Sequence, residues 1–276
     1  MTRSPLAGKT ILVTRPAERS VRLVKLLDQR GARAIVAPAI ALRPVRSAAL
    51  SAALRDLAAG RYVWLVLTSP ATIAMLADRL AGPRDVRAAV AAVGDGTAEA
   101  FRRWARRDAD LRPRTFTVAA HARAFPRGEG RVLCPRADIA PDGLEEALQA
   151  KGWRAERVDA YRTVFARRLP REATDALGAG AVDAVTFTSA STVRGFVGAV
   201  EAVRGLPKVV CIGPVTAAEA RAHGLTVQAV ADPHTTDGLV GALERVFAPR
   251  RRSSDRAATN RPKARNGRSR SGPKAT

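Results

Sequence analysis

Residues 68–72 are Thr-Ser-Pro-Ala-Thr and residues 188–192 are Thr-Ser-Ala-Ser-Thr, so one polar motif recurs 120 residues later in the chain. Each copy directly follows a short apolar run, at 62–68 and 184–188, and precedes a segment with helical character. Continuous apolar strands that lead into helices are typical of parallel sheets covered on both faces. We therefore interpret the motif as the carboxyl end of a buried strand in each of two similar units.

Two further pairs of motifs share nearly this spacing. Arg15 and Arg136 lie 121 residues apart, and each is followed by a glycine 16 residues later. Residues 94–98 (Gly-Asp-Gly-Thr-Ala) match residues 213–217 (Gly-Pro-Val-Thr-Ala) at an offset of 119 residues. Three similar spacings indicate two copies of one α/β unit of about 120 residues.

The same alternation of apolar runs and amphipathic segments continues along the chain. A helix is predicted over 18–30, and Gly31 ends it as glycine commonly does. The predicted strands are 10–14, 34–37, 62–68, 90–93, 115–119, 131–134, 154–158, 184–188, 208–212 and 226–230. This pattern predicts an α/β fold with parallel sheets.

Charge separates a tail from the body of the protein. The 276 residues carry a net charge of +22, and residues 249–276 hold ten Lys or Arg and one Asp. The tail therefore carries +9 and the body +13. The tail contains almost no large apolar side chain, so we expect it to be disordered. It is either a solvated extension or a binder of nucleic acid or an anionic surface, and the basic body suits a polyanionic ligand.

Several classes of protein are excluded by the sequence. Cys134 and Cys211 lie inside apolar runs and are expected to be buried thiols. Metal-binding motifs and phosphate-binding loops are absent, and Glu99 stands where a dinucleotide fingerprint starting at Gly94 needs its third glycine. The three histidines are scattered. We predict no metal and no cofactor, so an enzyme of this kind acts mainly by holding its substrate.

The apolar segments of the sequence bear on the cellular location of the protein. Neither a signal-type segment at the amino terminus nor an apolar run of roughly 20 residues is present. We expect a cytoplasmic protein without a membrane span.

Candidate binding residues follow the predicted strands. Ligands of open α/β sheets lie at the carboxyl ends of the strands, and free N–H groups at helix starts attract carboxylates. The candidates at these positions are Arg15, Ser69, Gly94, Thr97, Arg136, Ser189, Gly213 and Thr216. A structural alternative exists for some of them, because Ser69 before Pro70 suits a helix N-cap and Thr216 with Glu219 suits a capping box.

The motifs in order resemble those of the uroporphyrinogen-III synthase family. The resemblance covers roughly residues 9–247 and rests on the whole series more than on any one motif. The matching segments are 13–16 (Val-Thr-Arg-Pro), 67–71, 93–97, 158–163 (Val-Asp-Ala-Tyr-Arg-Thr), 187–191, 211–216 and 233–239.

The resemblance implies two interleaved, flavodoxin-like lobes with parallel sheets. The first lobe would comprise residues 1–38 and 167–248, and the second would be inserted as residues 39–166, leaving 249–276 as the tail. Two extended connections, near 38–44 and 161–166, would join the lobes. The active site would be the cleft between them, and we expect a monomer.

The implied substrate is hydroxymethylbilane, a linear tetrapyrrole with eight carboxylates. The implied reaction removes water and closes the ring with inversion of the last pyrrole, giving uroporphyrinogen III. Tyr161 matches the family's tyrosine and would assist departure of the hydroxyl, although a tyrosine packed at the hinge fits the sequence as well. An acid beside a polyanion is unfavourable, so the Asp95 side chain is expected to point away.

Two other functions stay open at this point. A non-catalytic bilobal protein that binds a small anionic ligand would have a similar fold, since fold alone does not determine function. Nucleic-acid binding through the tail would weaken steeply with salt and would be lost without residues 249–276. The tail is too short and too polar to form a helix-turn-helix domain.

Overall fold

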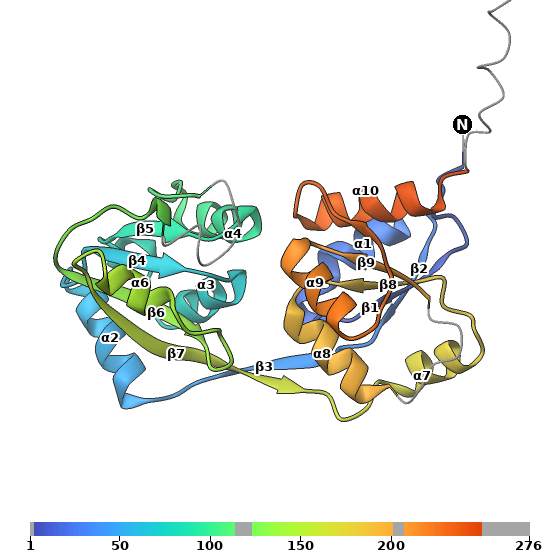
Figure 1. The fold of residues 1–276 in the computed structure, drawn as a ribbon, viewed down its shortest axis with the longest axis horizontal. Helices are drawn as coiled ribbons and strands as arrows, with labels where there is room; N and C mark the ends of the chain where they lie inside the picture. The colour runs from blue at the N-terminus through green and yellow to red at the C-terminus, as the bar shows by residue number, and fades with distance from the viewer. Residues whose placement is uncertain (1–2, 114–122, 201–206, 250–276) are drawn as a thin grey trace, which may run out of the picture.

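The computed structural model describes residues 3–113, 123–200 and 207–249 of the chain. They form two lobes that lie side by side, connected by a long extended ribbon (Figure 1). The predicted strand at 115–119 and the basic tail from residue 250 lie outside the described residues. Within these three described ranges, no helix is both long enough and apolar enough to cross a membrane.

The first lobe contains a parallel five-stranded sheet in the order β10-β9-β8-β1-β2. Its strands are β1 (Thr10–Val13), β2 (Arg33–Val36), β8 (Ala184–Phe187), β9 (Lys208–Cys211) and β10 (Val227–Val230). Its helices are η1 (Ala17–Arg19), α1 (Val21–Asp28), α7 (Arg171–Gly178), α8 (Ala190–Ala199), α9 (Pro214–Ala222) and α10 (Thr236–Phe247). The predicted helix over 18–30 is thus a short 3-10 turn followed by α1.

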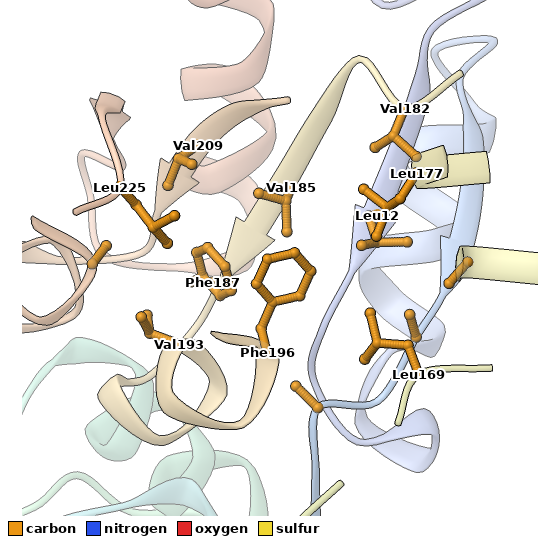
Figure 2. Close-up of a cluster of buried hydrophobic side chains, with 14 of the residues drawn as sticks. Leu12, Leu169, Leu177, Val182, Val185, Phe187, Val193, Phe196, Val209 and Leu225 are labelled. Atoms are coloured by element: carbon orange, nitrogen blue, oxygen red, sulfur yellow. The ribbon is translucent and has the colours of Figure 1, made fainter. Parts of the chain in front are cut away.

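Helices bury both faces of this sheet. Leu12 and Phe187 point to the face where Phe196 of α8 packs edge-on against Phe187, with ring centroids 5.3 Å apart (Figure 2). Ile11 and Val13, the neighbours of Leu12, belong to the core on the other face, with the leucines of α1 and α10. Because side chains alternate along a strand, an apolar run with no polar residue is needed to fill both cores.

The second lobe contains a five-stranded sheet in the order β3-β7-β6-β4-β5, in which only β3 is antiparallel to its neighbour. Its strands are β3 (Ile40–Pro44), β4 (Trp64–Leu67), β5 (Ala89–Ala92), β6 (Arg131–Ala137) and β7 (Arg154–Phe165). Its helices are α2 (Ala48–Ala58), α3 (Pro70–Ala77), η2 (Pro83–Asp85), α4 (Asp95–Ala105) and α6 (Leu144–Gln149).

The repeat seen in the sequence reappears in the strand order. Four neighbouring strands of the first sheet, β2-β1-β8-β9, correspond to β7-β6-β4-β5 of the second, in the same spatial order. The first sheet therefore has the flavodoxin-type order, and the second has it for these four strands. The expected fold, two interleaved α/β lobes, is confirmed.

The two predicted connections between the lobes pair with each other. β3 and β7 run antiparallel from Ile40 opposite Phe165 to Pro44 opposite Tyr161. The strand predicted at 154–158 therefore continues to Phe165, because pairing with β6 and then, from Tyr161, with β3 keeps the chain extended beyond Val158. At its far end the ribbon packs against α8 of the first lobe.

Gly195 of α8 lets this helix approach the ribbon closely. A Cβ atom at this position would overlap the carbonyl oxygen of Ala39. We expect Gly195→Ala to lower the free energy of unfolding by about 1–3 kcal/mol through overpacking, which thermal denaturation measures as a lower Tm. Gly198→Ala in the same helix meets no atom within 4 Å and should be neutral or slightly stabilising. Equal Tm values for both variants would contradict the assignment.

Candidate functional site

The carboxyl ends of the two sheets face each other (Figure 1). In the flavodoxin-type order, ligands bind outside the strand ends at the point where the chain reverses its direction of strand addition. This point lies between β1 and β8 in the first lobe and between β6 and β4 in the second. Arg15 and Ser189 follow the first pair of strands, whereas Ser69 follows β4 and Arg136 lies within β6.

Both predicted serines are helix N-caps. Ser69 Oγ accepts a hydrogen bond from Ala71 N at 3.0 Å, with Pro70 in the first turn, as expected from the sequence. Ser189 forms a full capping box, in which its Oγ accepts from Thr192 N at 3.2 Å and the Thr192 hydroxyl accepts from Ser189 N at 3.2 Å. Each hydroxyl thus satisfies one helix-start N–H, and the remaining N–H groups of that turn stay directed beyond the strand end.

The glycine motifs also begin helices. Gly94, with φ of 85°, precedes α4, and Gly213 precedes α9. Thr97 and Thr216 lie in the first turns of these helices and are only 3% and 4% exposed. The capping box expected for Thr216 and Glu219 is wrong, because the N-cap is Gly213 and makes no side-chain bond. Glu219 instead lies 3.6 Å from Arg194 and 3.2 Å from His223.

Asp95 at the start of α4 forms an ion pair with Arg112. The guanidinium of Arg112 neutralises the carboxylate that appeared unfavourable beside a polyanion. The helix start at Gly94 thus keeps its positive end without a free negative charge next to it.

Tyr161 lies in β7 where the ribbon leaves the second lobe, and it is 6% exposed. It packs with Ala71 of α3 and with Ala160. Burial raises the pKa of Tyr161, whereas the nearby Ser69 hydroxyl and the positive charge of Arg19 act in the opposite direction. Because the net shift is upward, the phenol keeps its proton at neutral pH and can act as a hydrogen-bond donor.

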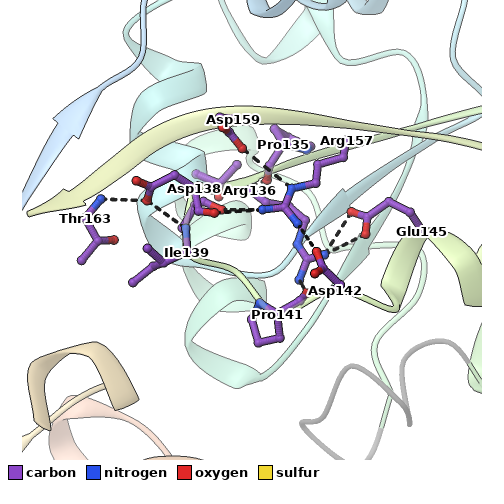
Figure 3. Close-up of polar contacts among 12 residues, drawn as sticks. Pro135, Arg136, Asp138, Ile139, Pro141, Asp142, Glu145, Arg157, Asp159 and Thr163 are labelled. Carbon is purple, nitrogen blue, oxygen red and sulfur yellow. Dashed lines mark hydrogen bonds and ion pairs between the residues drawn. The ribbon is translucent and has the colours of Figure 1, made fainter. Parts of the chain in front are cut away.

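The side chain of Arg136 binds other residues of the second lobe (Figure 3). Its side chain is 1% exposed, and Nη1 donates to Glu145 Oε1 and Oε2 at 3.0 and 2.8 Å. Its Nη2 donates to the carbonyl oxygen of Pro141 at 2.7 Å. Its Nε is buried without a hydrogen-bond acceptor, but both Nη groups are engaged by Glu145 and Pro141. Because this guanidinium is almost fully buried and already paired with a carboxylate, we no longer assign Arg136 to substrate binding.

Arg15, its counterpart in the first lobe, has no such partner. Its Nη1 is 3.4 Å from Thr236 Oγ1, and its Nε is buried without a hydrogen-bond acceptor. Within the described part of the chain, no carboxylate lies within ion-pair distance of Arg15. Burial, with a further contribution from the charge of Arg19, lowers the pKa of Arg15 to about 10. The side chain remains charged at neutral pH but is incompletely solvated.

Two residues near these strand ends were not selected from the sequence. Arg19 was placed within the predicted helix over 18–30 and given no role, yet burial lowers its pKa, and its positive charge acts to lower the pKa of Tyr161. His234 was set aside with the scattered histidines. It lies beside Gly213, and its Nδ1 is 2.7 Å from the carbonyl oxygen of Ala231. The available signals were the proximity of Arg19 to the motif at 13–16 and the position of His234 within the motif at 233–239.

Comparison with known proteins agrees with this arrangement. The family described as uroporphyrinogen-III synthase HemD matches residues 21–241. The chain belongs to the uroporphyrinogen-III synthase family. The uroporphyrinogen-III synthase of Synechococcus elongatus is 30% identical over 260 residues, which cover 88% of this chain and 97% of the relative. The porphyrin biosynthesis protein HemD of Ruminiclostridium josui is 31% identical over 255 residues, 87% of this chain and 49% of the relative.

Solved structures of the family share the fold. A mutant uroporphyrinogen III synthase from Thermus thermophilus matches with a TM-score of 0.61 at 21% identity, covering 87% of this chain and 99% of that one. The Helicobacter pylori protein matches with a TM-score of 0.56 at 14% identity, covering 86% and 99%. At these identities the likeness supports the two-lobed fold and leaves the assignment of individual site residues to chemistry.

Proposed function

We propose that this protein is a uroporphyrinogen-III synthase that converts hydroxymethylbilane to uroporphyrinogen III with loss of water. The observation that carries the proposal is family membership over residues 21–241, together with two sheets whose carboxyl ends face each other. The substrate would lie between these ends, in contact with both lobes.

The substrate first loses its terminal hydroxyl. Tyr161, protonated and buried beside α3, would donate a hydrogen bond or its proton to this hydroxyl as the C–O bond breaks. Water leaves, and the remaining azafulvene carbon is attacked by the last pyrrole through a spiro intermediate. Fragmentation and reclosure then invert that ring.

Orientation would be the main contribution of the protein to selectivity. Closure without inversion gives the symmetric type I isomer, so the enzyme has to hold the chain ends in the less accessible geometry. Helix starts carry partial positive charge that favours carboxylates. The groups that would contact the eight carboxylates lie at the starts of α3, α4, α8 and α9, namely Ser69, Gly94, Thr97, Ser189, Gly213 and Thr216.

The organisation of the chain is part of the proposal. Residues 1–38 and 167–248 would form one domain and residues 39–166 the other, with the β3–β7 ribbon between them. A cytoplasmic monomer fits a protein whose two cysteines, Cys134 and Cys211, are buried free thiols, because cytosolic proteins rarely contain disulfides.

The proposal is tested by identifying the isomer that is formed. Hydroxymethylbilane is generated in place by its own synthase, mixed with this protein, and the oxidised porphyrins are separated by chromatography. A predominance of type III isomer is the expected result. Type I isomer alone, at the rate of the buffer control, would contradict the proposed activity and favour a bilobal protein that only binds an anionic ligand.

A role of the basic tail in nucleic-acid binding is a separate question. It requires DNA affinity that falls steeply with salt and disappears when residues 249–276 are removed. We expect the type III activity to persist in that truncated protein, because the motifs of the site end before residue 249.

A further inference from the structure

Arg15 and Arg136 occupy equivalent places in the two lobes. They follow or end the corresponding strands β1 and β6, 121 residues apart. The helices behind them align at the same offset, because Leu23 and Leu27 of α1 match Leu144 and Leu148 of α6, and all four leucines are fully buried. The alignment is therefore set by core packing as well as by sequence.

The surroundings of Arg15 and Arg136 differ at one equivalent position of the two lobes. Glu145, which holds Arg136, corresponds by this offset to Val24 in α1. The first lobe thus retains the arginine and lacks its carboxylate. A guanidinium that loses water on burial and gains no anion is destabilising. Nε lacks an acceptor in both arginines, so the difference lies in the Nη groups. Those of Arg15 have only the weak contact with Thr236 at 3.4 Å, and no carboxylate of the described residues compensates the charge.

A second arginine increases the local positive charge. Arg19, in η1, is half-buried, and no carboxylate of the described residues lies within ion-pair distance of it. The groups that favour its charged form are Tyr161 and the exposed Glu18. Arg19 and Arg15 repel each other, and burial lowers the pKa of both. Two adjacent cations at the carboxyl end of β1 form a site for an anion that the chain itself does not supply.

We propose that Arg15 and Arg19 anchor carboxylates of the tetrapyrrole on the first lobe and place the reacting end of the substrate against Tyr161. This inference rests on the proposed function and adds Arg19 as a positioning residue. Arg19 lies in η1, one turn after Arg15, and so adds a second positive charge at the carboxyl end of β1, which faces the second lobe. The second lobe has no equivalent anchor at Arg136, so the two lobes bind the substrate differently.

Thermal denaturation of the ligand-free protein gives the first test. If Arg15 is a binding site for an external anion, Arg15→Met removes an uncompensated, partly buried charge and raises Tm by roughly 2–4 °C. Arg136→Met is the matched comparison, because it leaves Glu145 unpaired and lowers Tm. A fall in Tm for both variants would assign Arg15 a purely structural role and overturn the proposal.

Binding of uroporphyrin III, a fluorescent octacarboxylate, gives the second test without turnover. We expect Arg15→Met and Arg19→Gln each to weaken binding at least about tenfold and to reduce its dependence on salt. Arg33→Gln is the control, because Arg33 is exposed and paired with Glu172 at the opposite end of β2. Unchanged affinity in both variants would overturn the proposal.

The isomer assay separates this inference from the proposed function. If the unmodified protein forms type III isomer, Arg19→Gln should raise KM and increase the share of type I isomer, whereas an unaltered isomer ratio and KM would contradict positioning by Arg19. If the unmodified protein forms no type III isomer, the proposed function fails by itself. The porphyrin titration then still decides whether the two arginines bind a polycarboxylate.

Discussion

Tyr161→Phe is expected to lower kcat for uroporphyrinogen III formation by about 100-fold or more, with the fold intact. The substitution removes only the hydroxyl, and proton donation by a positioned group typically contributes a factor of about 10²–10⁴. The raised pKa of Tyr161 means that its proton is present throughout the neutral range. The measurement is single-turnover conversion of hydroxymethylbilane, with thermal denaturation to check the fold.

Tyr62→Phe provides the matched control. Tyr62 is also a buried tyrosine of the second lobe, but its hydroxyl donates to Glu156 Oε2 at 2.7 Å and accepts from Arg131 Nη2 at 3.0 Å. These groups lie at the start of the strands, away from the carboxyl ends. We expect a lower Tm and near-normal turnover. Near-normal turnover in Tyr161→Phe would remove Tyr161 from the mechanism and leave it as a residue that packs the hinge.

Arg136→Met is expected to lower the free energy of unfolding by about 3–5 kcal/mol. Removing one member of a buried ion pair leaves the other as an uncompensated charge. Glu145 has 14% of its side chain exposed, so it would remain largely buried and unpaired. Denaturant unfolding monitored by circular dichroism measures the change.

A double substitution measures the interaction between Arg136 and Glu145 apart from the effect of each residue alone. Arg136→Met with Glu145→Leu removes both charges, and similar apolar volumes refill the space behind β6. We expect most of the lost stability to return, because apolar replacement of a complete buried pair is often neutral or stabilising. If the double variant were as unstable as the sum of the single variants, the two residues would not act as a pair.

Much of the fold could be predicted from local patterns. Runs such as 10–14 and 184–188 contain only apolar residues and threonine, which is typical of a strand buried on both faces. The offset of about 120 residues showed that two equivalent units exist. The continuous β7 strand did not follow from local patterns, because residues 161–165 stay extended through pairing with β3, more than 100 residues away in sequence. Only the family resemblance implied an extended connection there.

The sequence indicated which segments would lie at the candidate site, but not which of their side chains are free to bind a ligand. Ser69 is an N-cap, as its sequence context indicated, since capping depends on residues within one turn. The structure adds Ser189 as a second N-cap and excludes the capping box of Thr216 and Glu219. Arg15 and Arg136 looked alike in sequence because both follow an apolar strand. Their difference depends on whether a carboxylate on the next helix reaches the guanidinium, which is a property of packing.

The sequence by itself determined the two α/β units, most of their strands, the Ser69 cap and the family to which the chain belongs, because these follow from residue type and from the spacing of motifs along the chain. The tertiary structure alone decided which polar groups are satisfied. It paired Arg136 with Glu145, left Arg15 without a carboxylate, and brought the charge of Arg19 to Tyr161. Burial and charge compensation depend on distances between segments remote in sequence, and these distances exist only in the folded chain.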